Sequence, residues 1–316
     1  MSLSDYHIPV LVNEVIENLK LQNGGIYVDC TVGGGGHSFE ILKQSSNITL
    51  YCFDQDEEAI RFAKKRLIPY KNQVMFFNEN FQNFRNRLAL ERVNKVDGIL
   101  MDIGVSNHQI TADNRGFSFQ IDSKLDMRMN KNDLKSAYNV VNEYELDDLV
   151  RIFKEYGEER FSKRIANAII RYREQQEIIS TKDLAKIIDS VNPVKQAVLQ
   201  NKTKARIFQA IRIEVNNELL ILKQALNDAI CLLNPGGRLA VISWHSLEDR
   251  IVKQFFVEQV GQCTCPKDLP VCMCNKQQRI NIVTKKPIIP TKEEIMVNSN
   301  ARSAKLRVAE KLSLKN

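Results

Sequence analysis

The chain has 316 residues, 43% hydrophobic and 26% charged, which is typical of a globular protein of about two domains. Its net charge of +7 permits an anionic partner without requiring one. The first residues lack the cationic segment and apolar core of a signal peptide, and no apolar run is long enough to cross a bilayer. These features argue against secretion and against membrane insertion, and we expect a cytoplasmic protein.

The first third of the chain alternates between strand and helix patterns. A helical spacing of apolar residues over 10–19 precedes short apolar runs that predict strands at 26–30, 50–53, 74–77 and 96–101. Helices are predicted between these runs, one of them over 57–67, where Pro69 follows. This order is typical of a doubly wound, mostly parallel sheet.

A run of four glycines, Gly33–Gly36, lies between the first strand and the helix-like stretch 39–43. Glycines let a ligand approach the main chain closely, and the helix start that follows offers N–H groups. The dinucleotide spacing G-x-G-x-x-G fails, because Ser38 and Phe39 stand where its last glycine is needed. Asp29, Thr31, Gly33 and Gly35 match better the first motif of class I S-adenosylmethionine (SAM) methyltransferases. A different nucleotide, or a glycine turn without a ligand, stays open at this point.

Two further acids end predicted strands. Asp54 closes the second strand, where a carboxylate can accept hydrogen bonds from both hydroxyls of a ribose. Asp102 closes the fourth strand, at the edge of the sheet where open α/β folds bind ligands. Phe81 follows the third strand, and it either covers an adenine ring or fills the core.

The alternation breaks between 110 and 204. Helices are expected over 143–174, with an interruption at Gly157, and over 181–191, with Thr181 as the N-cap. We therefore predict a helical insertion at 110–204 in a discontinuous domain of 1–109 and 205–316. The insertion and its exit are rich in cations, which form either a solvated face or a nucleic-acid surface: Arg160, Lys163, Arg164, Arg171, Arg173, Lys202, Lys204 and Arg206.

The strand pattern then resumes. A long helix is predicted over 205–233, a turn over 234–237 and a fifth strand over 238–243. Ser246 and Asp249 fit a capping box, and His245 beside them is either structural or catalytic. Runs at 279–283 and 305–309 predict a closing pair of strands.

Several stretches together resemble one family. They are GGGGHS, DIGVSNHQ, RGFSF, LDMRM, YGEERFSKRIA, FQAIRIEVNNEL, NPGGRLAVISWHSLEDRIVK and NARSAKLRVAE. In this order they resemble the MraW family, the bacterial ribosomal RNA small subunit methyltransferases H, over nearly the whole chain. The resemblance implies a class I methyltransferase fold with a seven-stranded sheet. It also implies SAM-dependent methylation of the N4 amine of a cytosine in the decoding region of 16S ribosomal RNA, free or in the assembled subunit.

The resemblance also implies which residues contact SAM. They are Gly35, Gly36, His37, Asp54, Phe81, Asp102 and Gln109. We expect His37 to act through its backbone. Gln109 follows from the resemblance alone.

Asp102 is also the candidate catalytic residue, because a carboxylate can accept hydrogen bonds from the target amine and receive its surplus proton. Many amino-methyltransferases carry an Asp/Asn-Pro-Pro-aromatic motif at this strand end, whereas here it reads Asp102-Ile103-Gly104-Val105. An aromatic ring that stacks on the base must then come from elsewhere, and Phe117, Phe119 and Trp244 are candidates.

Four cysteines form two C-x-C pairs, Cys263 with Cys265 and Cys272 with Cys274. Four thiolates could hold a structural zinc ion, although the pairs are tighter than the usual spacing. We favour four reduced thiols in a loop, and we expect no catalytic metal.

Three other classes of function place different requirements on the sequence. An NAD-linked oxidoreductase needs the fuller glycine motif, which is absent. A SAM-dependent enzyme for a small molecule or a protein has no need of a basic insertion. An RNA-binding module without catalysis tolerates the loss of Asp54 and Gly35.

Overall fold

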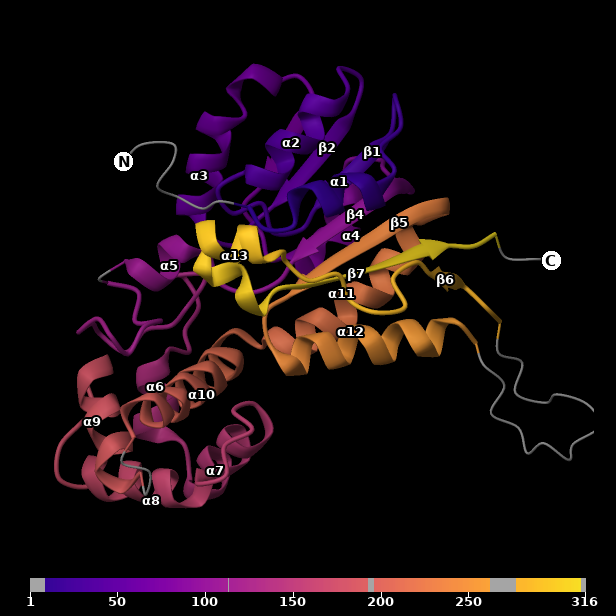
Figure 1. Cartoon of the computed structure of the whole chain (residues 1–316). Helices are drawn as coiled ribbons and strands as arrows, with labels where there is room; N and C mark the ends of the chain where they lie inside the picture. The colour runs from indigo at the N-terminus through magenta and orange to yellow at the C-terminus, as the bar shows by residue number, and fades with distance from the viewer. Residues whose placement is uncertain (1–8, 113, 193–195, 262–276, 314–316) are drawn as a thin grey trace, which may run out of the picture. The chain divides into compact units, whose positions relative to one another are not determined.

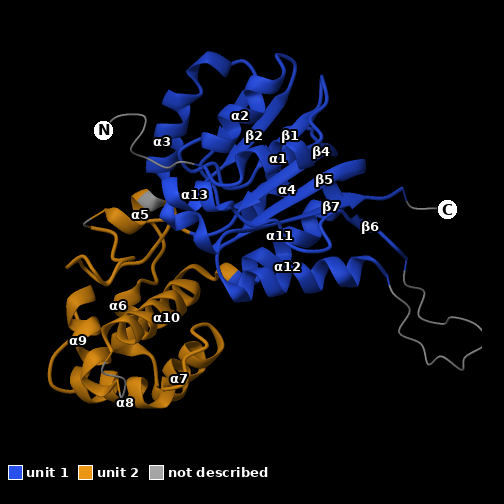
Figure 2. Cartoon of the chain, viewed as in Figure 1, with its two compact units in different colours: residues 1–104, 219–316 blue, residues 105–218 orange. Residues whose placement is uncertain are grey.

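The computed structural model describes residues 9–112, 114–192, 196–261 and 277–313. Its chain divides into two compact units (Figure 2). Unit 1 comprises residues 1–104 and 219–316, and unit 2 comprises residues 105–218. Unit 2 is therefore an insertion in the sequence of unit 1.

Unit 1 is built on one seven-stranded sheet of order β3-β2-β1-β4-β5-β7-β6 (Figure 1). The first five strands are parallel, and β7 runs antiparallel to both β5 and β6. The expected seven-stranded α/β sheet and its closing pair are thus confirmed. The strands are β1 (Ile26–Asp29), β2 (Thr49–Phe53), β3 (Val74–Phe77), β4 (Val96–Asp102), β5 (Leu233–Ser243), β6 (Ile280–Ile282) and β7 (Lys305–Lys311).

Helices cover both faces of this sheet, because successive residues of a strand point to opposite sides. Val28 and Ile99 pack in one cluster with residues of α4, α11 and α12, whereas Tyr27 and Leu100 pack in a second cluster with residues of α1, α2 and α3. Burial on both faces explains why Ile99, Leu100 and Met101 of β4 are three successive apolar residues. The helices are α1 (Val12–Leu19), α2 (Gly36–Gln44), α3 (Glu57–Arg66), α4 (Phe84–Leu90), α11 (Glu218–Leu232), α12 (Ser246–Gln259) and α13 (Lys292–Val297), with 3-10 turns η1 (Ile68–Tyr70), η2 (Phe81–Asn83) and η3 (Ser299–Ser303).

Unit 2 is helical around a core of its own. Gly157 lies between α7 and α8, and only glycine fits there, since a side chain would lie 2.7 Å from the Phe153 carbonyl oxygen and 2.9 Å from that of Arg206. The helices are α5 (Asn107–Thr111), α6 (Ala137–Glu143), α7 (Leu146–Glu155), α8 (Ser162–Arg173), α9 (Thr181–Val191) and α10 (Ala197–Asn216). No helix among the described residues is long and apolar enough to cross a membrane.

Three local predictions were wrong. The helix expected over 205–233 is two helices, since Asn217 adopts a left-handed conformation with φ of 50° between α10 and α11. Asparagine tolerates this conformation better than most residues. The N-cap of α9 is Ser180, which accepts from the Asp183 N–H, while the Thr181 hydroxyl donates to the Ile121 carbonyl. The turn expected at 234–237 is part of β5, as an irregularity between the pairs Val96–Leu233 and Gly98–Arg238.

Candidate functional site

The glycine loop connects β1 to α2 and lies close to its neighbours. Gly35 is the N-cap of α2 with φ of 73°. A side chain on Gly35 would lie 3.3 Å from Ala63 of α3, and one on Gly36 would lie 2.8 Å from Pro9. At Gly33 the nearest atom would be the Thr31 carbonyl oxygen at 3.9 Å, so this face of the loop is open. The loop thus has its open face at Gly33, three residues before the start of α2.

Asp29 stabilises the glycine loop through two hydrogen bonds. Its carboxylate accepts hydrogen bonds from the Thr31 N–H at 3.2 Å and from the Ser38 hydroxyl at 2.6 Å. The residue is only 1% exposed, and this burial raises the pKa of the carboxyl. Asp29 therefore holds both ends of the turn and is enclosed by it.

Asp54 lies at the end of the neighbouring strand β2. One oxygen accepts from the Gly33 N–H and the other from the Asp56 N–H, each at 2.9 Å. Burial outweighs these hydrogen bonds and raises the pKa of Asp54 to about 7. The glycine loop and the second-strand acid are thus joined directly.

Asp102 lies at the end of β4. Its backbone N–H donates to the Thr31 hydroxyl at 2.7 Å, and its Oδ1 accepts from the Trp244 indole N–H at 3.0 Å. Its Oδ2 lies 3.7 Å from Nδ1 of His37, and the side chain keeps 13% of its surface exposed. Asp102 is therefore oriented by groups of β1–α2 and of β5–α12 while part of it stays accessible.

His37 lies in the first turn of α2, and its ring points inward. Nε2 lies 2.9 Å from the Val10 carbonyl oxygen, and the residue is 6% exposed. Burial lowers the pKa of this imidazole. The ring is thus engaged within unit 1, which leaves the backbone as the part of His37 that can face a ligand.

The other residues expected at the cofactor have structural surroundings. Phe81 begins η2 and packs, partly buried, against the core of unit 1. Gln109 is buried in unit 2, where its side chain accepts from the Ser106 N–H at 3.0 Å in the capping box of α5. The Ser-x-x-Gln spacing is a sequence signal for this box. The part of Phe81 and Gln109 in cofactor binding stays a prediction.

Sequence reasoning missed Thr31 as a partner of Asp102 and considered Trp244 only as a stacking ring. Of the three aromatic candidates, Trp244 is hydrogen-bonded to Asp102. In unit 2, Phe119 packs edge-to-face on Phe208 at 5.7 Å between ring centroids, and the Arg115 guanidinium lies 5.9 Å from the Phe117 ring.

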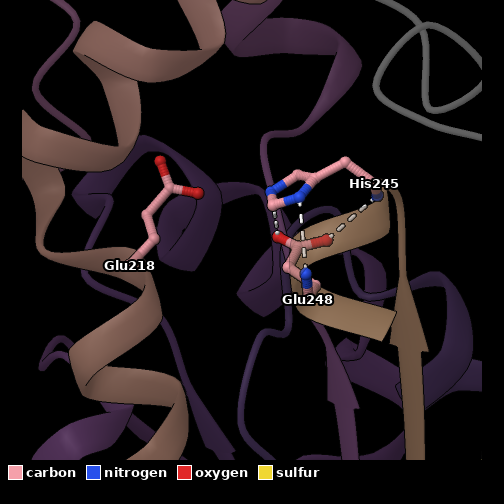
Figure 3. A group of neighbouring side chains, drawn as sticks. All are labelled: Glu218, His245 and Glu248. Carbon is pink, nitrogen blue, oxygen red and sulfur yellow. Dashed lines mark hydrogen bonds and ion pairs between the residues drawn. The ribbon is translucent and has the colours of Figure 1, made fainter. Parts of the chain in front are cut away.

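The capping box of α12 is formed by His245 and Glu248, so the prediction of Ser246 and Asp249 was wrong by one residue (Figure 3). Glu248 Oε2 accepts from the backbone N–H groups of Trp244 and His245 at 2.8 and 3.3 Å. Asp249 instead accepts from Arg307 of β7 at 2.6 Å, and this pairing lowers the pKa of Asp249. Histidine is an unusual N-cap, so the pattern of preferred caps could not identify it.

The capping contact also fixes the proton of His245. Because Nδ1 accepts from the Glu248 N–H at 3.4 Å, the ring proton of the neutral form lies on Nε2, 3.1 Å from Glu248 Oε1. The third residue in Figure 3, Glu218, accepts from Arg212 of unit 2 at 2.8 and 2.9 Å. Glu218 is thus paired with Arg212, and His245 serves as the N-cap of α12, although its buried Nε2 makes no hydrogen bond to any residue that the structure describes.

The eight cations named above for the insertion and its exit fall into two sets. Arg173 donates to the Val141 carbonyl, Lys204 pairs with Asp189 at 2.8 Å, and Arg206 pairs with Glu159 at 3.5 Å. The others are exposed, and none has an ion pair within the described part of the chain: Arg160, Lys163, Arg164, Arg171 and Lys202. The residues at 160, 163, 164 and 171 are spaced to share one side of α8 and its N-terminal approach. We call these four the α8 basic face.

The cysteine pairs at Cys263, Cys265, Cys272 and Cys274 lie outside the described residues. The zinc hypothesis therefore stays a prediction.

Comparisons with known proteins give one consistent result. Residues 4–312 match the model of the MraW methylase family. The ribosomal RNA small subunit methyltransferase H of Finegoldia magna is 50% identical over 97% of this chain and 98% of its own length, and that of Clostridioides difficile is 48% identical over 97% and 99%. A solved structure of a methyltransferase from Streptococcus mutans covers 97% of this chain and 100% of its own at 12% identity, with a TM-score of 0.46, too low to carry an argument.

We predict that His245→Ala lowers the free energy of unfolding by about 1 kcal/mol, because α12 loses its N-cap. His245→Asn should recover most of the loss, since asparagine is a good cap. Urea unfolding followed by circular dichroism measures both variants. Ser246→Ala is the matched control, and a larger loss in that variant than in His245→Ala would place the cap at Ser246 instead.

Proposed function

Because this chain belongs to the MraW methylase family, we propose that it transfers a methyl group from SAM to the exocyclic N4 amine of a cytosine in the decoding region of 16S ribosomal RNA. The names of its relatives support ribosomal RNA of the small subunit as the substrate. The observation that carries the proposal is the grouping of the glycine loop, Asp54 and Asp102 at the carboxyl ends of β1, β2 and β4.

The residues at this edge suit SAM. The open face at Gly33 leaves room for a ligand against the backbone, and the N-terminus of α2 supplies N–H groups for its carboxylate end. Each oxygen of the Asp54 carboxylate accepts one hydrogen bond from a backbone N–H. Each oxygen therefore has a further lone pair that can accept a hydrogen bond from a ribose hydroxyl. When bound, SAM supplies the methyl group on a sulfonium leaving group.

The protein must then activate a poor nucleophile. The lone pair of the N4 amine is delocalised into the cytosine ring, and a hydrogen bond from the amine to a carboxylate favours a more tetrahedral nitrogen. Asp102 is placed for this role, because Trp244 donates to its carboxylate and Thr31 accepts from its backbone N–H, while part of its surface stays accessible. Such positioning favours in-line attack.

The target base must leave its stack to reach Asp102, so the RNA must also be bound by a second surface of the protein. We assign this role to the α8 basic face, whose cations have no carboxylate partner among the described residues. Contacts to RNA phosphates from such a surface are electrostatic and depend on salt. Whether the substrate is free RNA or an assembled subunit is an outcome of the assay below.

The deciding assay follows methyl transfer from labelled SAM to assembled small subunits that lack the modification, to free ribosomal RNA and to protein. We expect N4-methylcytosine in the nucleosides of the first or second substrate. Label in protein or in small molecules alone would overturn the proposed function, and binding of NAD rather than SAM in calorimetry would overturn the cofactor.

We predict that Asp102→Asn lowers the turnover number about 10²- to 10⁴-fold, the usual contribution of a general base. SAM affinity should change much less, because asparagine keeps an oxygen for Trp244. Single-turnover kinetics and calorimetry separate the two quantities. Intact turnover in this variant would end the catalytic role of Asp102.

We predict that SAM affinity weakens as the pH falls through about 7, the raised pKa of Asp54. The ribose hydroxyls donate to the ionised form, so protonation of the carboxyl competes with binding. Between pH 8 and pH 6 the ionised fraction falls about tenfold, and the dissociation constant should rise by about the same factor. Calorimetry at both pH values tests this, with Asp54→Asn as a control of weak, pH-independent affinity. Equal affinities of the wild type would contradict the role of Asp54.

We predict that replacing Arg160, Lys163 and Arg164 together with glutamine weakens RNA binding and flattens the plot of log affinity against log salt. SAM affinity should stay unchanged. A control variant with glutamine at Lys64, Lys65 and Lys71 of unit 1 loses the same three charges. Its plot of log affinity against log salt should stay steeper than that of the first variant. Filter binding between 50 and 200 mM salt measures this, and equal slopes in the two variants would argue against the α8 basic face.

A further inference from the structure

Where His37 and Asp102 meet, the facing atoms Nδ1 and Oδ2 are both hydrogen-bond acceptors. A carbonyl oxygen can only accept, so the 2.9 Å contact with Val10 places the proton of the neutral imidazole on Nε2. Nδ1 then carries a lone pair, and it lies 3.7 Å from Oδ2 of Asp102. With an ionised Asp102 this contact holds no proton and gains no hydrogen bond.

When Nδ1 of His37 gains a proton, its contact with Asp102 becomes attractive. A protonated Nδ1 forms an ion pair with Oδ2, and the imidazolium also keeps its hydrogen bond to the Val10 carbonyl. The 3.7 Å between the two atoms must shorten before this ion pair becomes a charge-assisted hydrogen bond, in a site where only 7% of the imidazole and 13% of the carboxylate side chain are exposed. The arrangement is thus built to receive one proton.

The methylation step releases one proton. When N4 of cytosine forms its bond to the methyl carbon and the carbon–sulfur bond breaks, the nitrogen becomes cationic and must lose an N–H proton. Asp102 is the proposed acceptor, but a neutral Asp102 would lose its charge beside the reacting nitrogen. A second acceptor behind it keeps Asp102 ionised.

We propose that His37 is a positioning residue of the reaction, which takes the released proton from Asp102 at Nδ1 and leaves the carboxylate charged. The inference rests on the proposed function of Asp102. The balance is complete, because one N–H bond of the amine is broken, one N–H bond of the imidazolium is formed, and the carboxylate only carries the proton between them. No further reactant is required.

The electrostatics around His37 suit this role. Burial lowers the pKa of the imidazole, so the ring is neutral and ready to accept at neutral pH. Asp29 of β1, the hydrogen bond to Val10 and Glu294 of α13 oppose this lowering of the pKa and favour the imidazolium. Among the described residues, Asp102 of β4 is the acid within 4 Å of the ring.

The test compares His37→Gln with the wild type, using labelled SAM at saturation and small subunits that lack the modification. Glutamine can donate to the Val10 carbonyl through its amide, but it cannot accept a proton. We expect SAM affinity within about threefold of wild type and a turnover number about 10- to 100-fold lower, less than the loss expected for a direct general base. The acidic limb of the turnover–pH profile that belongs to the histidine should disappear.

A double-mutant cycle adds a readout that a merely structural role would not move. If His37 acts through Asp102, then His37→Gln should cost little in the Asp102→Asn background, because the two residues work as one unit. Wild-type turnover in His37→Gln, or additive losses in the double variant, would overturn the inference. A wild type that methylates no RNA would instead overturn the proposed function.

A measurement on the unaltered protein covers the case in which His37→Gln folds poorly. Nitrogen-15 NMR of the four histidines distinguishes the ring tautomers. We expect the His37 ring to be neutral with its proton on Nε2 at pH 7. A proton on Nδ1 would already fill the contact with Asp102, and the inference would fail.

Discussion

The parallel register of β1, β2, β4 and β5 is the constraint on which the site depends. Asp29 pairs with Cys52 of β2 and with Leu100 of β4, and Asp102 pairs with Ile242 of β5. These backbone pairings bring three acids from distant parts of the sequence to one edge of the sheet. A shift by one residue in any pairing would turn these side chains to the other face.

The same edge concentrates negative charge in a poorly hydrated place. Burial raises the pKa of Asp29 and takes that of Asp54 to about 7, although each carboxylate accepts two hydrogen bonds. Such a cost is tolerated where a ligand relieves it. A sulfonium cation and ribose hydroxyls would do so, and the buried imidazole of His37 provides a site for a proton between the acids.

Much of this site follows from the sequence because strand ends have a strong signal. Apolar runs that end in Asp54 and Asp102 predicted both acids at the right edge, and the glycine run predicted the loop. What failed was either local, at helix ends, or depended on tertiary contacts. Asn217 breaks a continuous helical pattern, and His245 caps a helix in place of Ser246. The contacts of His37 with Val10 and of Asp102 with Trp244 join residues 27 and 142 positions apart in the sequence. No sequence motif of fixed spacing indicates such contacts.

The chain passes between its units at two points, after Gly104 and before Leu219. Gly104 has φ of 122°, and Asn217, two residues before the second point, has φ of 50°. Every pairing of the seven-stranded sheet is made by residues outside this interval. The inserted unit thus lies within the single connection between β4 and α11. Changes in its length or charge leave the strand pairings that place the acids unaltered.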